Sequence, residues 1–271
     1  FNWNPHDVPR YDVGPYTSDG RNPEREQGLY GMGRFSLADP LTLVLGGRLD
    51  WSHLASPTDE KRVNAKFTPY GGLIFDLDRQ WSLYGSYAQV FKPQSDRNRK
   101  GEMLDPMTGT NYEAGIKGEL ADALNVSLAL FQIDQKDRAQ AEPSVVPCRG
   151  RNCPSISGGK VRSRGFELEA IGDITPYWNL MAGYTFNTTR YLTDTRSAGQ
   201  PLASFAPRHM FRLWTEYALP ALARRLSVGG GVQVQSGFYN VSGAITLRQG
   251  GYALADMRVA YRVDKHVTVA L

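Results

Sequence analysis

Apolar and polar residues alternate with a period of two along most of this chain of 271 residues. Between Leu41 and Trp51 the odd positions are mostly leucine, whereas the even positions include Thr42, Arg48 and Asp50. Because successive side chains of a β-strand point to opposite faces of its sheet, this period predicts strands with one apolar and one polar face. The pattern recurs at residues 112–120, 166–170, 211–219, 226–235 and 255–263. The chain is therefore predicted to be all-β.

The connections between these segments alternate between short and long. Tight turns are expected at residues 38–41, 76–81, 120–125, 173–178, 219–226 and 263–267. Long connections are expected at residues 52–65, 92–110, 136–160, 191–207 and 237–250. A membrane-spanning barrel carries short turns at one rim and long loops at the other. Because a soluble sandwich rarely sorts its loops by side, the alternation favours a transmembrane antiparallel β-barrel.

Aromatic residues and composition agree with strands in a membrane. No apolar run approaches the roughly 18 residues that a membrane helix needs, and the mean hydropathy is −0.41. A barrel strand needs no such run, since only every second residue meets lipid. Tyrosine and tryptophan favour the membrane interface, where the ring is buried and the polar tip stays hydrated. Six of them near strand ends are expected to form girdles: Trp51, Trp81, Trp178, Trp214, Tyr217 and Tyr261.

The chain is expected to be one domain over residues 1–271, with no linker. Residues 1–25 are expected to form an extracellular loop, and residues 26–271 about twelve strands, the first near Gln27–Leu37 and the last starting at Val267. An open sheet edge in lipid leaves backbone hydrogen-bonding groups unpaired, which costs several kcal/mol each. This chain is therefore expected to be part of a larger barrel.

Two cysteines, Cys148 and Cys153, lie together in the longest predicted loop. Without a nearby histidine they make a poor metal site, so a disulfide formed in an oxidising compartment is predicted. The four histidines are scattered, and no nucleophile-elbow, Walker or dinucleotide motif occurs. Glu167 and Glu169 share one strand face, which indicates a solvated lumen wall. No catalytic residue, metal site or cofactor is predicted.

Several longer stretches resemble a known family. They are Trp81–Gln94 (WSLYGSYAQVFKPQ), Leu104–Glu119, Val161–Glu169, Pro207–Trp214 and Gly229–Gln235. They resemble the barrel of TonB-dependent ferric-siderophore receptors, in the branch for ferripyoverdine, ferric coprogen and related hydroxamate chelates. The resemblance covers roughly residues 26–270.

The resemblance implies a roughly 22-stranded barrel filled by an N-terminal plug domain that is absent from this chain. It implies an outer-membrane receptor that binds a ferric siderophore and imports it, energised by the TonB-ExbB-ExbD complex through the missing N-terminal part. Iron arrives inside its chelator, so no protein ligand to the metal and no cofactor are expected. The mouth should instead offer aromatic and polar groups.

Strand parity and the resemblance together nominate binding residues at the loop end. Tyr191, Tyr239 and Tyr252 are predicted to point into the lumen there, with Gln233 and Gln235 just below them. The alternative for each is a rim residue that packs against loops or the plug.

Basic residues gather near two predicted loops. Those near the cysteines are Arg149, Arg151, Lys160, Arg162 and Arg164, and those near the other loop are Arg97, Arg99 and Lys100. They suit either an anionic chelate or the phosphates of lipopolysaccharide in the outer-membrane lipid. A net charge of only +4 argues against nucleic acid. The alternative functions are a passive porin or channel and, less favoured, a soluble β-sandwich adhesin.

Overall fold

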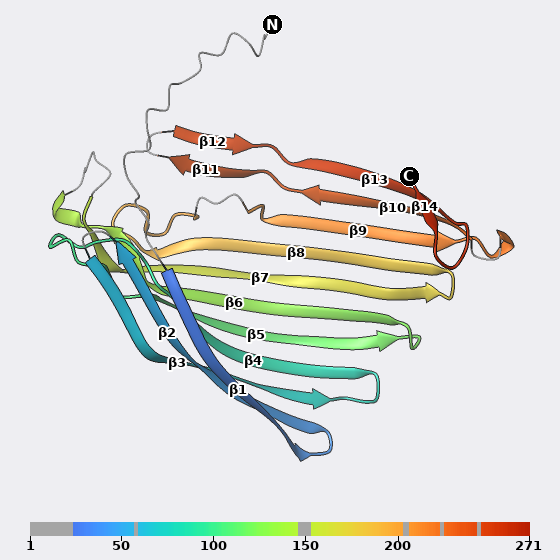
Figure 1. Ribbon diagram of the computed structural model, residues 1–271, viewed down its shortest axis with the longest axis horizontal. Coiled ribbons are helices and arrows are strands. Elements are labelled where there is room, and N and C mark those ends of the chain that lie inside the picture. The colour runs from blue at the N-terminus through green and yellow to red at the C-terminus, as the bar shows by residue number, and fades with distance from the viewer. Residues whose placement is uncertain (1–23, 57–58, 146–152, 203–205, 223–224, 243–244) are drawn as a thin grey trace, which may run out of the picture.

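A computed structural model describes residues 24–56, 59–145, 153–202, 206–222, 225–242 and 245–271. Twelve strands form one sheet in the order β1 to β10, β13, β14, and every neighbouring pair is antiparallel (Figure 1). The strands are β1 (Glu24–Ala38), β2 (Leu41–Ser56), β3 (Asp59–Asp76), β4 (Trp81–Lys92), β5 (Met107–Leu120), β6 (Leu124–Ala141), β7 (Ser155–Thr175), β8 (Trp178–Thr193), β9 (His209–Ala218), β10 (Leu226–Gln235), β13 (Tyr252–Arg262) and β14 (Thr268–Ala270). The prediction of an all-β antiparallel fold is confirmed.

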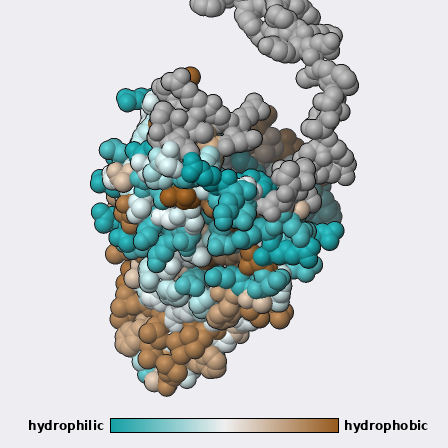
Figure 2. Space-filling model, turned by 90° about the vertical axis from the view of Figure 1, so that its left-hand side faces the viewer, coloured by the Kyte–Doolittle hydropathy of each residue, from teal (hydrophilic) through white to brown (hydrophobic). Residues whose placement is uncertain are grey.

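The sheet is strongly curved and does not close, with β1 and β14 at its two edges (Figure 1). The turns that join β1 to β2, β3 to β4, β5 to β6, β7 to β8, β9 to β10 and β13 to β14 lie at one end of the sheet. The long connections lie at the other end, here called the loop end, together with the two-residue connection between β2 and β3. The described helices are the 3-10 turns η1 (Pro143–Val145) and η2 (Pro220–Leu222), neither long and apolar enough to cross a bilayer. Figure 2, which faces the loop end, shows hydrophilic residues over much of it and hydrophobic residues gathered below.

Residues paired across neighbouring strands share a face, so the register shows how the two faces differ. One row of paired residues crosses ten strands and is apolar or aromatic throughout: Leu41, Phe75, Leu83, Ile116, Leu128, Leu168, Tyr184, Phe211, Val234 and Ala253. The adjacent row, on the concave side, is mixed and polar: Thr42, Ile74, Tyr84, Gly115, Ala129, Glu167, Thr185, Met210, Gln235 and Tyr252. We call these the outer and inner faces.

Three boundaries differ from the sequence prediction. Strand β1 begins at Glu24, two residues before the predicted boundary at 26. The expected long connection at 52–65 is mostly strand, because polar side chains such as His53 and Glu60 continue the pairing of β2 with β3 beyond the apolar segment. The expected loop at 237–250 contains a separate hairpin of β11 (Phe238–Ser242) and β12 (Ile245–Gln249).

Trp214 was predicted to belong to an aromatic girdle, and that prediction is wrong. Arg212, Trp214 and Glu216 are alternate residues of β9 and therefore share one face, the inner face. Trp214 pairs there with Met181 and Gly231. The nearest atom that a Cβ at Gly231 would meet is Cε3 of Trp214, at 2.6 Å, so the indole covers this glycine. The other five girdle aromatics lie on the outer face: Trp51, Trp81, Trp178, Tyr217 and Tyr261.

Candidate ligand-binding site

Strand β8 brings Tyr191 to the loop end of the inner face. Tyr191 pairs with Val161 of β7, whose side chain is buried. Asn187 and Thr189 precede it at alternate positions of the same strand, and both share its face. Asn187 and Thr189 therefore have the same strand parity as Tyr191, but they were not nominated from the sequence.

The segment after β8 folds back onto Tyr191. The Tyr191 amide donates a 3.0 Å hydrogen bond to the carbonyl of Gln200, and the Gly199 amide donates a 2.8 Å bond to the carbonyl of Tyr191. The Asp194 carboxylate accepts hydrogen bonds from the amides of Arg196 and Ser197, at 2.9 and 2.8 Å. These bonds hold residues 194–201 as a compact loop over the strand end.

Tyr239 reaches the same loop from the β11–β12 hairpin. Its hydroxyl donates a 3.5 Å hydrogen bond to the carbonyl of Pro201, and it lies close enough to Tyr191 for their hydroxyls to interact electrostatically. Arg138 and Asp194 also interact electrostatically with Tyr191. The structure therefore places two of the nominated tyrosines close together, with the cationic Arg138 and the anionic Asp194 nearby.

A cavity of about 370 Å³ opens beside these groups. Its lining combines hydrogen-bonding side chains and two aromatic residues from β8, the segment before β9 and the hairpin: Asn187, Thr189, Arg208, Phe238 and Tyr239. This mixture of rings and polar atoms suits a ligand with both aromatic and hydrogen-bonding groups.

The remaining nominated residues lie on β10 and β13. Gln235 pairs with Tyr252 on the inner face, and only 8% of its surface is exposed. Gln233 lies lower, in an inner groove of about 650 Å³ that also includes Asp256 and Arg212. Four of the five nominated residues therefore share the inner face and divide between the rim and the groove, whereas Tyr239 lies on the separate β11–β12 hairpin.

The inner face carries charged groups that are held in pairs. Arg258 Nη1 contacts both carboxylate oxygens of Glu216, at 3.0 and 2.9 Å, across the intervening Gly229 of β10. The Tyr84 hydroxyl donates a 2.7 Å hydrogen bond to Glu113. Arg48 and Asp50, by contrast, pair along a single strand.

The predicted disulfide and part of the basic group near the cysteines extend beyond the described residues. Cys153 is disulfide-bonded, but Cys148 lies outside the described residues, as do Arg149 and Arg151, so the Cys148–Cys153 pairing stays a prediction. Within the described part of the chain, no group of histidine, cysteine and acidic side chains is arranged to hold a metal ion. Arg162 and Arg164 lie within β7 and not in a rim loop.

This curved, two-faced antiparallel sheet, with its loop-end cavity, is the architecture of a membrane-barrel receptor. The family described as "TonB dependent receptor-like, beta-barrel" matches the chain over residues 1–271. The chain belongs to this family, whose members are outer-membrane transport receptors and not enzymes.

Individual relatives support the assignment. The ferric-pyoverdine M114 receptor PbuA of Pseudomonas sp. strain M114 is 37% identical over 98% of this chain and 35% of its own length. The crystal structure of the ferripyoverdine receptor of Pseudomonas aeruginosa, bound to ferripyoverdine, superposes with a TM-score of 0.79 at 31% identity, covering 91% of this chain and 34% of that one. The alcaligin receptor FauA of Bordetella pertussis has a TM-score of 0.72 at 36% identity, covering 92% and 42%. The chain spans about a third of the length of the curated relatives that it matches.

Proposed function

We propose that the receptor to which this chain belongs binds a ferric siderophore at the loop end and imports it across the outer membrane. The carrying observation is the convergence of Tyr191 and Tyr239 on the 194–201 loop, beside a cavity with aromatic and polar walls. The relatives named for ferric pyoverdine and alcaligin support this ligand class.

The site suits an iron chelate in which the metal is already enclosed. Tyrosine rings offer flat apolar surface and hydroxyl donors, and Gln235 and Gln233 offer amide donors and acceptors further down the face. Arg138 adds a cationic group that attracts an anionic chelate. The protein then needs no ligand to the iron and no cofactor of its own.

Two kinds of partner complete the proposal. Import through a plugged barrel requires energy, which we assign to the TonB-ExbB-ExbD complex acting through a part of the receptor outside this chain. The apolar outer face faces outer-membrane lipid, and lipopolysaccharide is its proposed neighbour at the loop end.

The experiment replaces Tyr191, Tyr239 and Tyr252 with alanine, singly and together, in the full-length receptor. Ferripyoverdine and ferric alcaligin serve as probes, and binding is followed by quenching of intrinsic fluorescence. Aromatic anchors commonly contribute about 1 to 2 kcal/mol each, so each single change that removes an anchor should weaken binding roughly 5- to 30-fold.

Tyr217→Ala is the matched control, because Tyr217 lies on the outer face near the turn end. Its siderophore affinity should equal that of the parent receptor. If the triple variant binds both chelates as tightly as the parent, the tyrosines are packing residues and the site assignment fails.

A further inference from the structure

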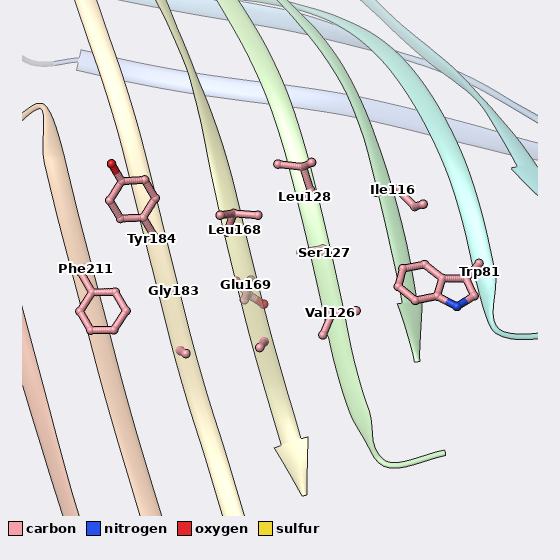
Figure 3. A pocket seen from close by; sticks show the side chains of 12 residues that line it. Trp81, Ile116, Val126, Ser127, Leu128, Leu168, Glu169, Gly183, Tyr184 and Phe211 are labelled. Carbon is pink, nitrogen blue, oxygen red and sulfur yellow. The ribbon is translucent and has the colours of Figure 1, made fainter. Parts of the chain in front are cut away.

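Arg138 of β6 lies on the inner face, although its position along the strand predicts the outer face. Even-numbered residues of β6 point outward over most of its length, and Leu128 among them lines an apolar groove of the outer face (Figure 3). Arg138, also even-numbered, pairs with Gly159 of β7, which alternates with the inner-face residue Val161. Since paired residues share a face, Arg138 points to the side on which Tyr191 lies.

A β-bulge causes this change of face. Two residues of β6, Lys136 and Asp137, oppose the single residue Lys160 of β7. One extra residue on a strand reverses the parity of the residues that follow it, and bulges often redirect a side chain beside a binding site. Asp137 has a φ of 59°, in the left-handed region that non-glycine residues seldom occupy. Such a conformation persists only where the surrounding structure holds it.

The side chain of Gln94 holds the bulge. Gln94 follows β4, and its amide reaches over the start of β5 to the backbone of β6. Its Nε2 donates hydrogen bonds to the carbonyls of Asp105 and Asp137, at 2.5 and 2.8 Å, and its Oε1 accepts one from the amide of Ala139, at 3.0 Å. Only 7% of its surface is exposed. Two of these bonds therefore fix the residues immediately before and after Arg138.

Other hydrogen bonds to the bulge reach only one residue. Thr108 Oγ1 donates to the carboxylate of Asp137, and Ser157 Oγ donates to its carbonyl, both at 3.2 Å and both at exposed positions. The Gln94 amide, in contrast, restrains Asp137 and Ala139 together. Because hydrogen bonds are stronger where water is excluded, the buried Gln94 amide is the main restraint on the direction of Arg138.

The redirected guanidinium carries a charge that is open to a ligand. Arg138 interacts electrostatically with Tyr191, and its side chain is partly exposed. Within the described part of the chain it forms no ion pair. Arginine binds a carboxylate through two parallel hydrogen bonds, so this position suits an anionic group on a chelate that lies against Tyr191.

We propose that Gln94 is a positioning residue of the siderophore site, and that by fixing the bulge it turns Arg138 towards chelates that carry a free carboxylate. Without the amide, Asp137 is released from its left-handed conformation, the bulge shifts along β6, and Arg138 returns to the outer face. The receptor then loses its preference for an anionic chelate over a neutral one. This inference rests on the proposed function and names the charge of the preferred ligand.

The first experiment measures the role of the charge in the full-length receptor. The probes are a ferripyoverdine with a free carboxylate and the same chelate with that carboxylate converted to an amide, and binding is followed by fluorescence quenching. Arg138→Gln should weaken binding of the carboxylate form about tenfold and leave the amide form unchanged, because hydrogen bonds to charged groups contribute about that much. Arg138→Lys should retain most of the preference. Equal affinity of Arg138→Gln and the parent for the carboxylate form overturns the proposal.

Arg190→Gln is the matched control. It removes the same charge at the loop end, but Arg190 pairs with Arg162 on the outer face. Its preference for the carboxylate form should equal that of the parent receptor.

A double-mutant cycle tests whether Gln94 acts through Arg138. Gln94→Ala should reduce binding of the carboxylate form as Arg138→Gln does, and it should cause no further loss when Arg138 is already glutamine. Additive losses would show that Gln94 acts elsewhere. Equal loss of both probes would also contradict the proposal, and it would point to the 194–201 loop, where Thr195 Oγ1 donates a 2.7 Å hydrogen bond to the carbonyl of Ala141.

A measurement without any ligand separates this inference from the proposed function. Spin labels on Arg138→Cys and Tyr191→Cys should lie on one face, roughly 12 Å apart from the spacing of strands and residues, and should broaden each other's spectrum. Gln94→Ala should reduce the broadening, whereas Gln132→Ala, on the outer face of β6, should not. Unchanged broadening in Gln94→Ala overturns the positioning role even in a receptor that binds chelates. Failure of the parent to bind either chelate sinks the proposed function and, with it, the preference for a carboxylate.

Discussion

At the scale of single residues, the two inward glycines Gly165 and Gly183 show how local space decides tolerance to change. A Cβ at Gly165 would lie 1.8 Å from the carbonyl oxygen of Phe186, whereas the nearest such contact at Gly183 is 4.0 Å, to the carbonyl of Leu168. We expect Gly165→Ala to destabilise the folded barrel by about 1 to 3 kcal/mol, because the backbone of β8 must shift. Gly183→Ala, on the same pair of strands, should be close to neutral. Urea unfolding in detergent measures both, and equal midpoints would contradict the register of β7 with β8.

At the scale of one element, β10 places neighbouring residues on the outer and the inner face. Val232 lies on the outer face between Leu213 and Ala255, whereas Gln233 lies on the inner face between Arg212 and Leu254. A spin label at Val232 of the full-length receptor should be reached by a lipid-soluble quencher, and a label at Gln233 should not. In addition, Val232→Arg near mid-membrane should lower the free energy of unfolding by about 2 to 4 kcal/mol. Gln233→Arg should lower it far less. Equal quenching of the two labels would contradict the assignment of Val232 to the outer face and Gln233 to the inner face.

At the scale of the whole molecule, the choice lies between gated uptake and a passive pore. A receptor filled by a plug should import ferripyoverdine only in cells with a working TonB complex, and it should exclude an unrelated solute of similar size. A porin would pass both solutes whether or not the complex is present. Uptake of radiolabelled iron in matched strains with and without TonB distinguishes the two, and TonB-independent uptake would favour the porin.

The sequence by itself determined the two-faced strands, the alternation of short and long connections and the receptor family. The strands and their connections follow from local rules, since the side-chain period of a strand and the chemistry of a tight turn depend on neighbouring residues. The family followed from the resemblance of the longer stretches. The face of Tyr191 and of Gln235 was readable in the same way, because each continues the parity of its strand.

Tertiary structure decided which residues meet. The approach of Tyr239 to Tyr191 depends on residues 194–201 folding back and on a hairpin where only a loop was expected. Neither feature has a residue periodicity from which it could be predicted. Trp214 was misplaced because position near a strand end was given more weight than parity. Arg162 and Arg164 were grouped with the loop near the cysteines because this part of β7 lacks apolar alternation, although its backbone pairing continues. Register is set by contacts between distant segments, and that is why the pairing of Arg162 with Asp134 became visible only in the folded sheet.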